Sequence, residues 1–127
     1  MGDLSKYFSA WEFDCPHCGA TKGPAPELLD VLDRMRHKLG RPLVIVSGYR
    51  CPEFNARVGG IPGSEHQWGR AADVPRGLFK APAARLAGAH GCGLRDGWVV
   101  HVDVTPGRRF FTFNDRPPAP TRPSQRR

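Results

Sequence analysis

The chain has 127 residues, 39% of them hydrophobic, a size and composition that fit one domain with a modest core. No run of about 18 apolar residues occurs, which excludes a transmembrane helix and predicts no membrane insertion. The N-terminus, MGDLSKYFSA, has no apolar stretch, so no secretory signal peptide is predicted.

The net charge of +7 favours anionic partners, such as nucleic acids or acidic cell-wall polymers. Its distribution argues against a specific nucleic-acid function, because the last twelve residues, RPPAPTRPSQRR, carry four arginines and no acidic residue. This Pro-rich stretch has almost no apolar side chains and is expected to be disordered. We therefore expect one domain over residues 1–115 and a basic tail over residues 116–127.

The first part of the chain is expected to be mainly helical. Residues 7–13, YFSAWEF, predict a short helix capped by Ser9, and a loop rich in proline and glycine follows. A longer helix is predicted from Pro26 to Gly40, because proline suits the first turn of a helix and glycine suits its end. Its apolar residues recur at helical spacing and predict one buried face, made of Leu28, Leu29, Leu32, Met35 and Leu39.

Short strands are expected to alternate with loops in the middle of the chain. Residues 43–46, within PLVIVSGYR, predict a short buried strand. A short helix or turn is predicted over residues 51–60, a glycine-rich loop over residues 60–69, and a short strand over residues 70–75, RAADVP.

The last third of the folded part predicts a helix and a hairpin. Residues 81–90 suit a helix, and residues 97–106, GWVVHVDVTP, predict a strand from their valine content. Residues 108–113, RRFFTF, are predicted to be the hairpin partner of that strand. This mixed order of helices and short strands predicts an α+β fold, with a small antiparallel sheet flanked by helices.

The four cysteines leave three readings open. Cys15 and Cys18 form one CxxC, whereas Cys51 and Cys92 lie far apart, so the two paired knuckles of a zinc ribbon are missing. Disulfides, a structural metal site built from distant thiols, and free buried thiols all remain compatible with this spacing. His17 could join a cysteine metal site.

Three residues have the donor atoms of a catalytic zinc site. His66 and Asp73 lie on either side of a glycine-containing turn, and His101 lies on a separate predicted strand. Two imidazoles and one carboxylate would leave a fourth tetrahedral position for water, which is typical of catalytic rather than structural zinc. Zinc in such a site lowers the pKa of the water and polarises a carbonyl.

The strand that carries His101 has a second acidic residue on the same expected face. His101 and Asp103 are two positions apart, so their side chains should point the same way, while Val100, Val102 and Val104 point into the core. Asp103 could then reach a metal-bound water. A strand with its polar face in solvent would show the same alternation.

Three ordered motifs, SGYRCPEFNARVGG, SEHQWGRAAD and WVVHVDV, closely resemble the zinc D,D-carboxypeptidase family of peptidoglycan peptidases, which shares its fold with the hedgehog signalling domain. The resemblance covers about residues 7–113 and is densest over residues 44–104. It implies a hedgehog/D,D-peptidase-like fold, zinc as the cofactor, and peptidoglycan peptide stems as the substrate.

The resemblance also implies roles for individual residues. It implies His66, Asp73 and His101 as zinc ligands. The arginine of SGYR, Arg50, matches the family arginine that faces the substrate carboxylate or the scissile carbonyl, and Ser64 matches the serine that helps to place the substrate.

One position departs from the family pattern. Many members carry a catalytic glutamate three residues before the last histidine, where this chain has Trp98. The His-Val-Asp ending resembles one subgroup of the family, so Asp103 is our candidate general base and Asp96 the second choice.

These residues predict a monomeric zinc peptidase that hydrolyses amide bonds in peptidoglycan stems, as a D,D-carboxypeptidase or an endopeptidase. Small size, a basic tail and the missing signal peptide suit a phage endolysin or a virion-borne wall hydrolase, made in the cytoplasm and acting at the cell wall. The alternatives are a non-catalytic zinc-binding module of hedgehog-like fold and, third, a nucleic-acid-binding protein.

Overall fold

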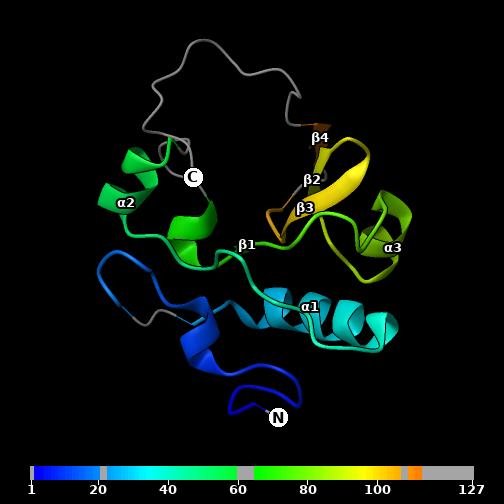
Figure 1. The fold of residues 1–127 in the computed structure, drawn as a ribbon, viewed down its shortest axis with the longest axis horizontal. Helices are drawn as coiled ribbons and strands as arrows, with labels where there is room; N and C mark the ends of the chain where they lie inside the picture. Colours follow the sequence, from blue (N-terminus) through cyan, green and yellow to red (C-terminus); the bar gives the residue numbers. More distant parts are fainter. Residues whose placement is uncertain (1, 21–22, 60–64, 107–108, 113–127) are drawn as a thin grey trace.

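The computed structural model describes residues 2–20, 23–59, 65–106 and 109–112. The predicted α+β class is confirmed: short helices surround a small sheet (Figure 1). The tail predicted over residues 116–127 lies outside the described residues. Within the described part, none of the helices has the length and apolarity needed to cross a membrane.

The N-terminal segment forms a short 3₁₀ helix, η1 (Ala10–Phe13), within the predicted range. The Glu12 carboxylate accepts a hydrogen bond of 2.9 Å from the backbone N–H of Ser9. This N–H has no partner within the helix, so the contact caps the start of the helix. Phe13 is buried against Phe8, with ring centroids 5.9 Å apart. This contact anchors the segment to the core.

The longest helix, α1 (Pro26–Leu39), has the predicted bounds. Gly40 ends it in the left-handed conformation with φ of 76°, which costs glycine little. The expected apolar face is confirmed for Leu28, Leu32 and Met35, which are buried in the core together with Val31, whereas Leu29 and Leu39 are only partly buried against it.

Four strands form one sheet in the order β1-β3-β2-β4. They are β1 (Ala71–Asp73), β2 (Gly91–Arg95), β3 (Trp98–Asp103) and β4 (Arg109–Thr112). β3 is central and antiparallel to both β1 and β2, so the predicted antiparallel sheet is confirmed for three strands.

The hairpin prediction for residues 108–113 is wrong. β4 pairs in parallel with β2 rather than with β3. Both edges of β3 are already occupied by β1 and β2, so the free edge of β2 is the place left for a further strand.

The true hairpin joins β2 to β3 and was not predicted. Its turn is Asp96–Gly97, and both residues have positive φ, 55° and 83°. An Asp-Gly pair is the sequence signal for such a two-residue turn. β2 itself, GCGLR, escaped prediction because two of its five residues are glycine, which disfavours strand assignment.

The prediction of a buried strand at residues 43–46 is also wrong. The segment makes only an isolated bridge to β1, between Ser47 and Asp73. Leu43 is buried, but Val44 and Val46 are each 61% exposed. Buried and exposed side chains alternate along the segment because it lies along the outer edge of β1 with one face in solvent.

An irregularity in β3 changes which valines reach the core. The register with β2 shifts between Gly93 and Leu94, so one extra residue of β3 lies opposite β2. Val99 and Val102 are therefore fully buried, as Val104 nearly is, whereas Val100 is only half-buried. The prediction that Val100 points into the core is wrong for this reason.

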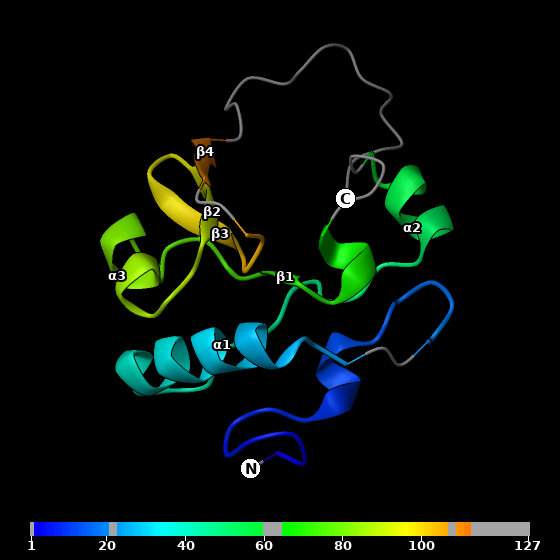
Figure 2. The same cartoon turned by 180° about the vertical axis from the view of Figure 1, so that it is seen from behind.

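Two short helices lie at opposite ends of the molecule with β1 between them in both views (Figures 1 and 2). α2 (Pro52–Arg57) follows the SGYR segment, and α3 (Ala81–Leu86) packs on β2 and β3. α3 ends earlier than the predicted residue 90, since Gly88 adopts a φ of 104°. Between α2 and β1 lies the 3₁₀ helix η2 (Glu65–Trp68) within the predicted loop.

Candidate metal centre

His66 is oriented by the backbone of the SGYR segment. It lies on η2 and is buried. Its Nδ1 is 2.8 Å from the carbonyl oxygen of Gly48. Because a carbonyl oxygen can only accept, Nδ1 carries the hydrogen, and Nε2 is left to face Asp73 at 3.2 Å from Oδ1.

Asp73 and His101 are brought together by the sheet. They are direct partners in the antiparallel register of β1 and β3, so their side chains lie side by side. Asp73 Oδ1 is 3.2 Å from His101 Nδ1 as well as from His66 Nε2. One carboxylate oxygen thus lies between two imidazoles that come from different elements.

These three residues form the donor cluster that the sequence predicts. One ligand atom from each of His66, Asp73 and His101 lies within 4.8 Å of the others. The two imidazole rings are tilted by 61°, with centroids 5.3 Å apart, so they converge without stacking.

The carboxylates of Asp73 and Asp103 favour a positive charge at the histidines of the cluster. Burial alone would raise the pKa of Asp73, but the positive charge of His66 and the hydrogen bonds from both histidines hold it well below its usual range. Burial alone would lower the pKa of His101, yet its hydrogen bonds with Asp103 and Asp73 raise it to about 9. The cluster therefore attracts positive charge that a metal cation could supply.

Asp103 contacts Nε2 of His101, the ring nitrogen that does not face Asp73. The prediction that His101 and Asp103 point to the same face of the strand is therefore confirmed. Asp103 is 1% exposed, and its Oδ2 is 2.9 Å from His101 Nε2. Its Oδ1 accepts a hydrogen bond of 3.1 Å from the backbone N–H of Thr105. Both ring nitrogens of His101 therefore face carboxylates, Asp73 at Nδ1 and Asp103 at Nε2.

Arg50 borders the cluster with its side chain largely buried. Its Nη2 is 3.8 Å from Asp73 Oδ2, and its backbone N–H donates to the carbonyl oxygen of His66 at 3.2 Å. The SGYR segment thus contributes the charge of Arg50 and, through Gly48, the carbonyl that orients His66.

The remaining candidate residues lie elsewhere. Asp96 is in the turn before β3, exposed and paired with Arg76 at 2.6 Å. Trp98 is at the start of β3, with Lys80 Nζ 4.3 Å from its ring centroid. Ser64 lies outside the described residues. The structure therefore brings Asp103 to the cluster and leaves Asp96 at the opposite end of β3.

The donor set fits zinc. Zn²⁺ takes imidazole nitrogen and carboxylate oxygen, and a site with three protein ligands keeps a position for water. Histidines that ligate a metal usually donate their other ring N–H to a carbonyl or carboxylate, which fixes the ring. His66 does this through Gly48, and His101 has Asp103 in the same position at Nε2.

Gly91 was not singled out by the sequence, yet it decides where Asp103 can lie. A Cβ atom on Gly91 would be 2.6 Å from both carboxylate oxygens of Asp103. The pairing of β2 with β3 places Gly91 directly opposite Asp103. No single-sequence signal marks such a contact, because it depends on the strand register.

Gly91→Ala is expected to push Asp103 off His101 and to weaken zinc binding about 10–100-fold, the usual effect of losing a contact that orients a ligand. Competition with a chromogenic chelator measures this. Gly23→Ala is the matched control, because a Cβ there meets nothing within 4 Å. Equal zinc affinity in the two variants would contradict an orienting role for Asp103.

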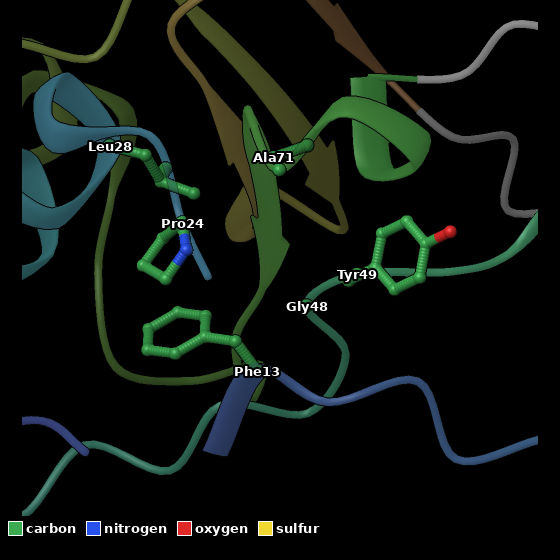
Figure 3. A pocket seen from close by; sticks show the side chains of 7 residues that line it. Phe13, Pro24, Leu28, Gly48, Tyr49 and Ala71 are labelled. Atoms are coloured by element: carbon green, nitrogen blue, oxygen red, sulfur yellow. The ribbon is translucent and has the colours of Figure 1, made fainter. Parts of the chain in front are cut away.

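A small apolar hollow is lined by Phe13, Pro24, Leu28, Gly48, Tyr49, Gly69 and Ala71 (Figure 3). The Tyr49 hydroxyl points away from the aromatic ring of Phe13 in this view. Gly69, which lines the hollow, has a φ of 73°. A Cβ atom added there would lie 2.8 Å from the Gly23 carbonyl oxygen, so this position needs glycine. The hollow is a packing feature, since Tyr49 is the one residue of its lining with a titratable side chain.

The cysteines separate into a group and a single residue. Cys15, Cys18 and Cys51 lie with their sulfur atoms within 4.8 Å of one another, whereas Cys92 is buried in β2 and does not belong to this group. Burial raises the pKa of the Cys15 thiol, but backbone N–H groups of Cys18 and Cys51 directed at its sulfur bring it down to about 7.

Comparison with known proteins identifies a family and a related enzyme that agree with a zinc-binding cluster. The chain matches the model of the Peptidase M15 family over residues 6–103. It is 31% identical to a zinc D-Ala-D-Ala carboxypeptidase from Streptomyces albus G over 107 residues, which are 81% of this chain and 42% of that protein. The chain thus spans less than half the length of this relative.

Proposed function

Because the chain belongs to the Peptidase M15 family, as its resemblance to the zinc D,D-carboxypeptidases predicted, we propose that it is a zinc peptidase acting on peptidoglycan stem peptides. The observation that carries the proposal is the convergence of His66, Asp73 and His101 from three elements onto one point. The 31% identity to a zinc D-Ala-D-Ala carboxypeptidase supports both the metal and the substrate class.

The three ligands would hold Zn²⁺ as a Lewis acid that polarises the scissile carbonyl and lowers the pKa of a water. Arg50 would bind a substrate carboxylate or the carbonyl oxygen, since its guanidinium is always charged and borders the cluster. Substrates with free carboxylates suit this positive group. Ser64 is proposed to help to place the substrate.

Asp103 is the proposed general base, which takes the proton from the attacking water and gives it to the leaving amine. In the structure its oxygens are engaged by Thr105 and His101. Each carboxylate oxygen has two lone pairs, so we propose that Asp103 Oδ2 accepts the proton of the water while it keeps its contact with His101. The same contact gives Asp103 a second role, which is to orient His101.

The proposal is tested by incubating the purified full chain with defined stem peptides and identifying the products by mass spectrometry. One peptide ends in D-Ala–D-Ala, one carries a cross-link and one tests the L-Ala–D-Glu bond. Cleavage is expected with zinc, loss after chelation and recovery on adding zinc back. The mass lost would name the bond and separate a carboxypeptidase from an endopeptidase.

Stoichiometric zinc at the His66–Asp73–His101 cluster without cleavage of any peptide would overturn the peptidase and favour the non-catalytic zinc-binding module. Trp98 at the position of the usual glutamate is the feature that favours that second candidate.

The fold, the C-terminal tail, the biological setting and the oligomeric state expected from the sequence are also proposals. We propose a hedgehog/D,D-peptidase-like fold for the domain over residues 1–115, with residues 116–127 as a basic tail that holds the protein near anionic wall polymers. A phage endolysin or a virion-borne wall hydrolase is the proposed setting, and a monomer the proposed state.

A further inference from the structure

Three cysteines from two distant parts of the sequence meet at one place. Cys15 and Cys18 lie in the turn after η1, and Cys51 directly precedes α2. Their sulfur atoms are mutually within 4.8 Å. Both views place the loop that carries Cys15 and Cys18 beside the start of α2 (Figures 1 and 2).

The backbone around these sulfurs is arranged as in a metal-binding knuckle. The Gly19 N–H donates to the Cys15 carbonyl oxygen at 2.8 Å, which closes the CPHC turn. The Cys51 N–H is directed at Cys15 Sγ at 3.5 Å, and the Phe54 N–H at Cys51 Sγ at 3.4 Å. Sulfurs that accept backbone N–H groups are stabilised as thiolates, the form that binds metals.

His17 supplies a nitrogen donor next to Cys51. Its Nδ1 is 3.6 Å from Cys51 Sγ, close to the ~3.5 Å that separates a sulfur and a nitrogen ligand of one tetrahedral zinc ion. Its Nε2 faces the Glu53 carboxylate at 3.9 Å, and its ring stacks on Phe54. A ligating histidine commonly has a carboxylate at its other nitrogen.

From this arrangement we propose a second, structural zinc site formed by Cys15, Cys18 and Cys51, with His17 as the fourth ligand. Three thiolates and one imidazole are a standard structural set for zinc. Binding releases the thiol protons to solvent and leaves the four ligands and the ion with one net negative charge. The site is separate from the His66–Asp73–His101 cluster and shares no ligand with it.

The proposed ion would connect the N-terminal segment to the loop of the first site. Cys51 directly follows Arg50, and Tyr49 donates its backbone N–H to the Phe13 carbonyl oxygen at 2.9 Å. A metal that joins Cys51 to Cys15 would therefore hold the SGYR segment, including the Gly48 carbonyl that orients His66. Its role is to position residues rather than to take part in the chemistry.

Zinc content of the full chain tests the proposal, with Asp73→Ala as the background, because that variant lacks a ligand of the first site. About one zinc ion per chain is expected in Asp73→Ala, and none after Cys18→Ser is added. Cys18 is exposed, so its replacement by serine disturbs no packing. Cys92→Ala, which changes the cysteine outside the group, is the matched control and should keep the ion.

Cobalt substitution gives an independent readout. Asp73→Ala loaded with Co²⁺ should show thiolate charge-transfer absorption that Cys18→Ser removes. His17→Ala should lose zinc to a chelator about tenfold faster or more; unchanged retention would remove His17 from the ligand set.

Absence of zinc and of this absorption in Asp73→Ala, or a mass two hydrogens lower from a disulfide among the three cysteines, would overturn the second site. The peptidase proposal would be unaffected, since it depends on cleavage by the wild-type chain.

Discussion

Asp73→Ala is expected to lose the zinc ion of the His66–Asp73–His101 cluster and peptide cleavage with it. Asp73 Oδ1 lies 3.2 Å from a nitrogen of each histidine, so this carboxylate is common to both imidazole contacts. Two neutral imidazoles alone are a poor zinc site, and kcat/KM should fall about a thousandfold or more, which corresponds to several kcal/mol of lost Lewis-acid stabilisation. Zinc content after dialysis and the initial cleavage rate measure the two effects.

The matched control is Asp30→Ala, which removes an exposed carboxylate from α1. It should keep both the zinc and the rate. Thermal unfolding followed by circular dichroism checks that Asp73→Ala remains folded. A folded Asp73→Ala that keeps its full zinc content and cleaves at the wild-type rate would place the catalytic metal elsewhere in the chain.

Asp103→Asn is expected to lower kcat about 10²–10⁴-fold, the usual contribution of a general base. The substitution removes the charge while nearly keeping the volume of a side chain that is 1% exposed. Because Asp103 also contacts His101 Nε2, zinc affinity should fall as well, by about 10–100-fold. Rates measured at saturating zinc separate the two effects.

The outcome at saturating zinc assigns the role. A rate that stays low supports proton transfer by Asp103. Complete recovery of the rate would limit Asp103 to orienting His101, and Asp96→Asn would then be the next variant to test. Wild-type rate and wild-type zinc affinity together would contradict both roles.

Local sequence signals predicted the elements that depend on neighbouring residues. The span of α1 followed from Pro26, Gly40 and the helical spacing of its leucines, because caps and an amphipathic face are properties of one short segment. The proposed ligands were found in the same way, since His66, Asp73 and His101 each lie within a short recognisable motif. The cluster in the structure contains these three residues.

Local signals failed where a partner strand decided the outcome. The 43–46 segment has the composition of a strand, but its end makes only one isolated bridge to β1, in which Val46 and Ser47 bond to Asp73, and its valines remain in solvent. The RRFFTF stretch is next to β3 in sequence, yet it pairs with β2 because β3 has no free edge. Strand pairing is a property of the whole sheet, and no short window contains it.

By itself, the sequence determined the class of fold, the long helix and the three residues, His66, Asp73 and His101, that meet as a candidate metal-binding cluster. Only the tertiary structure decided that Asp103 lies against His101, that Gly91 leaves room for its carboxylate, and that Cys51 rather than Cys92 joins Cys15 and Cys18. Some of these contacts join residues that are distant in the sequence, and the others depend on the register of the strands. They exist only once the chain has packed, since packing alone fixes the distances between them.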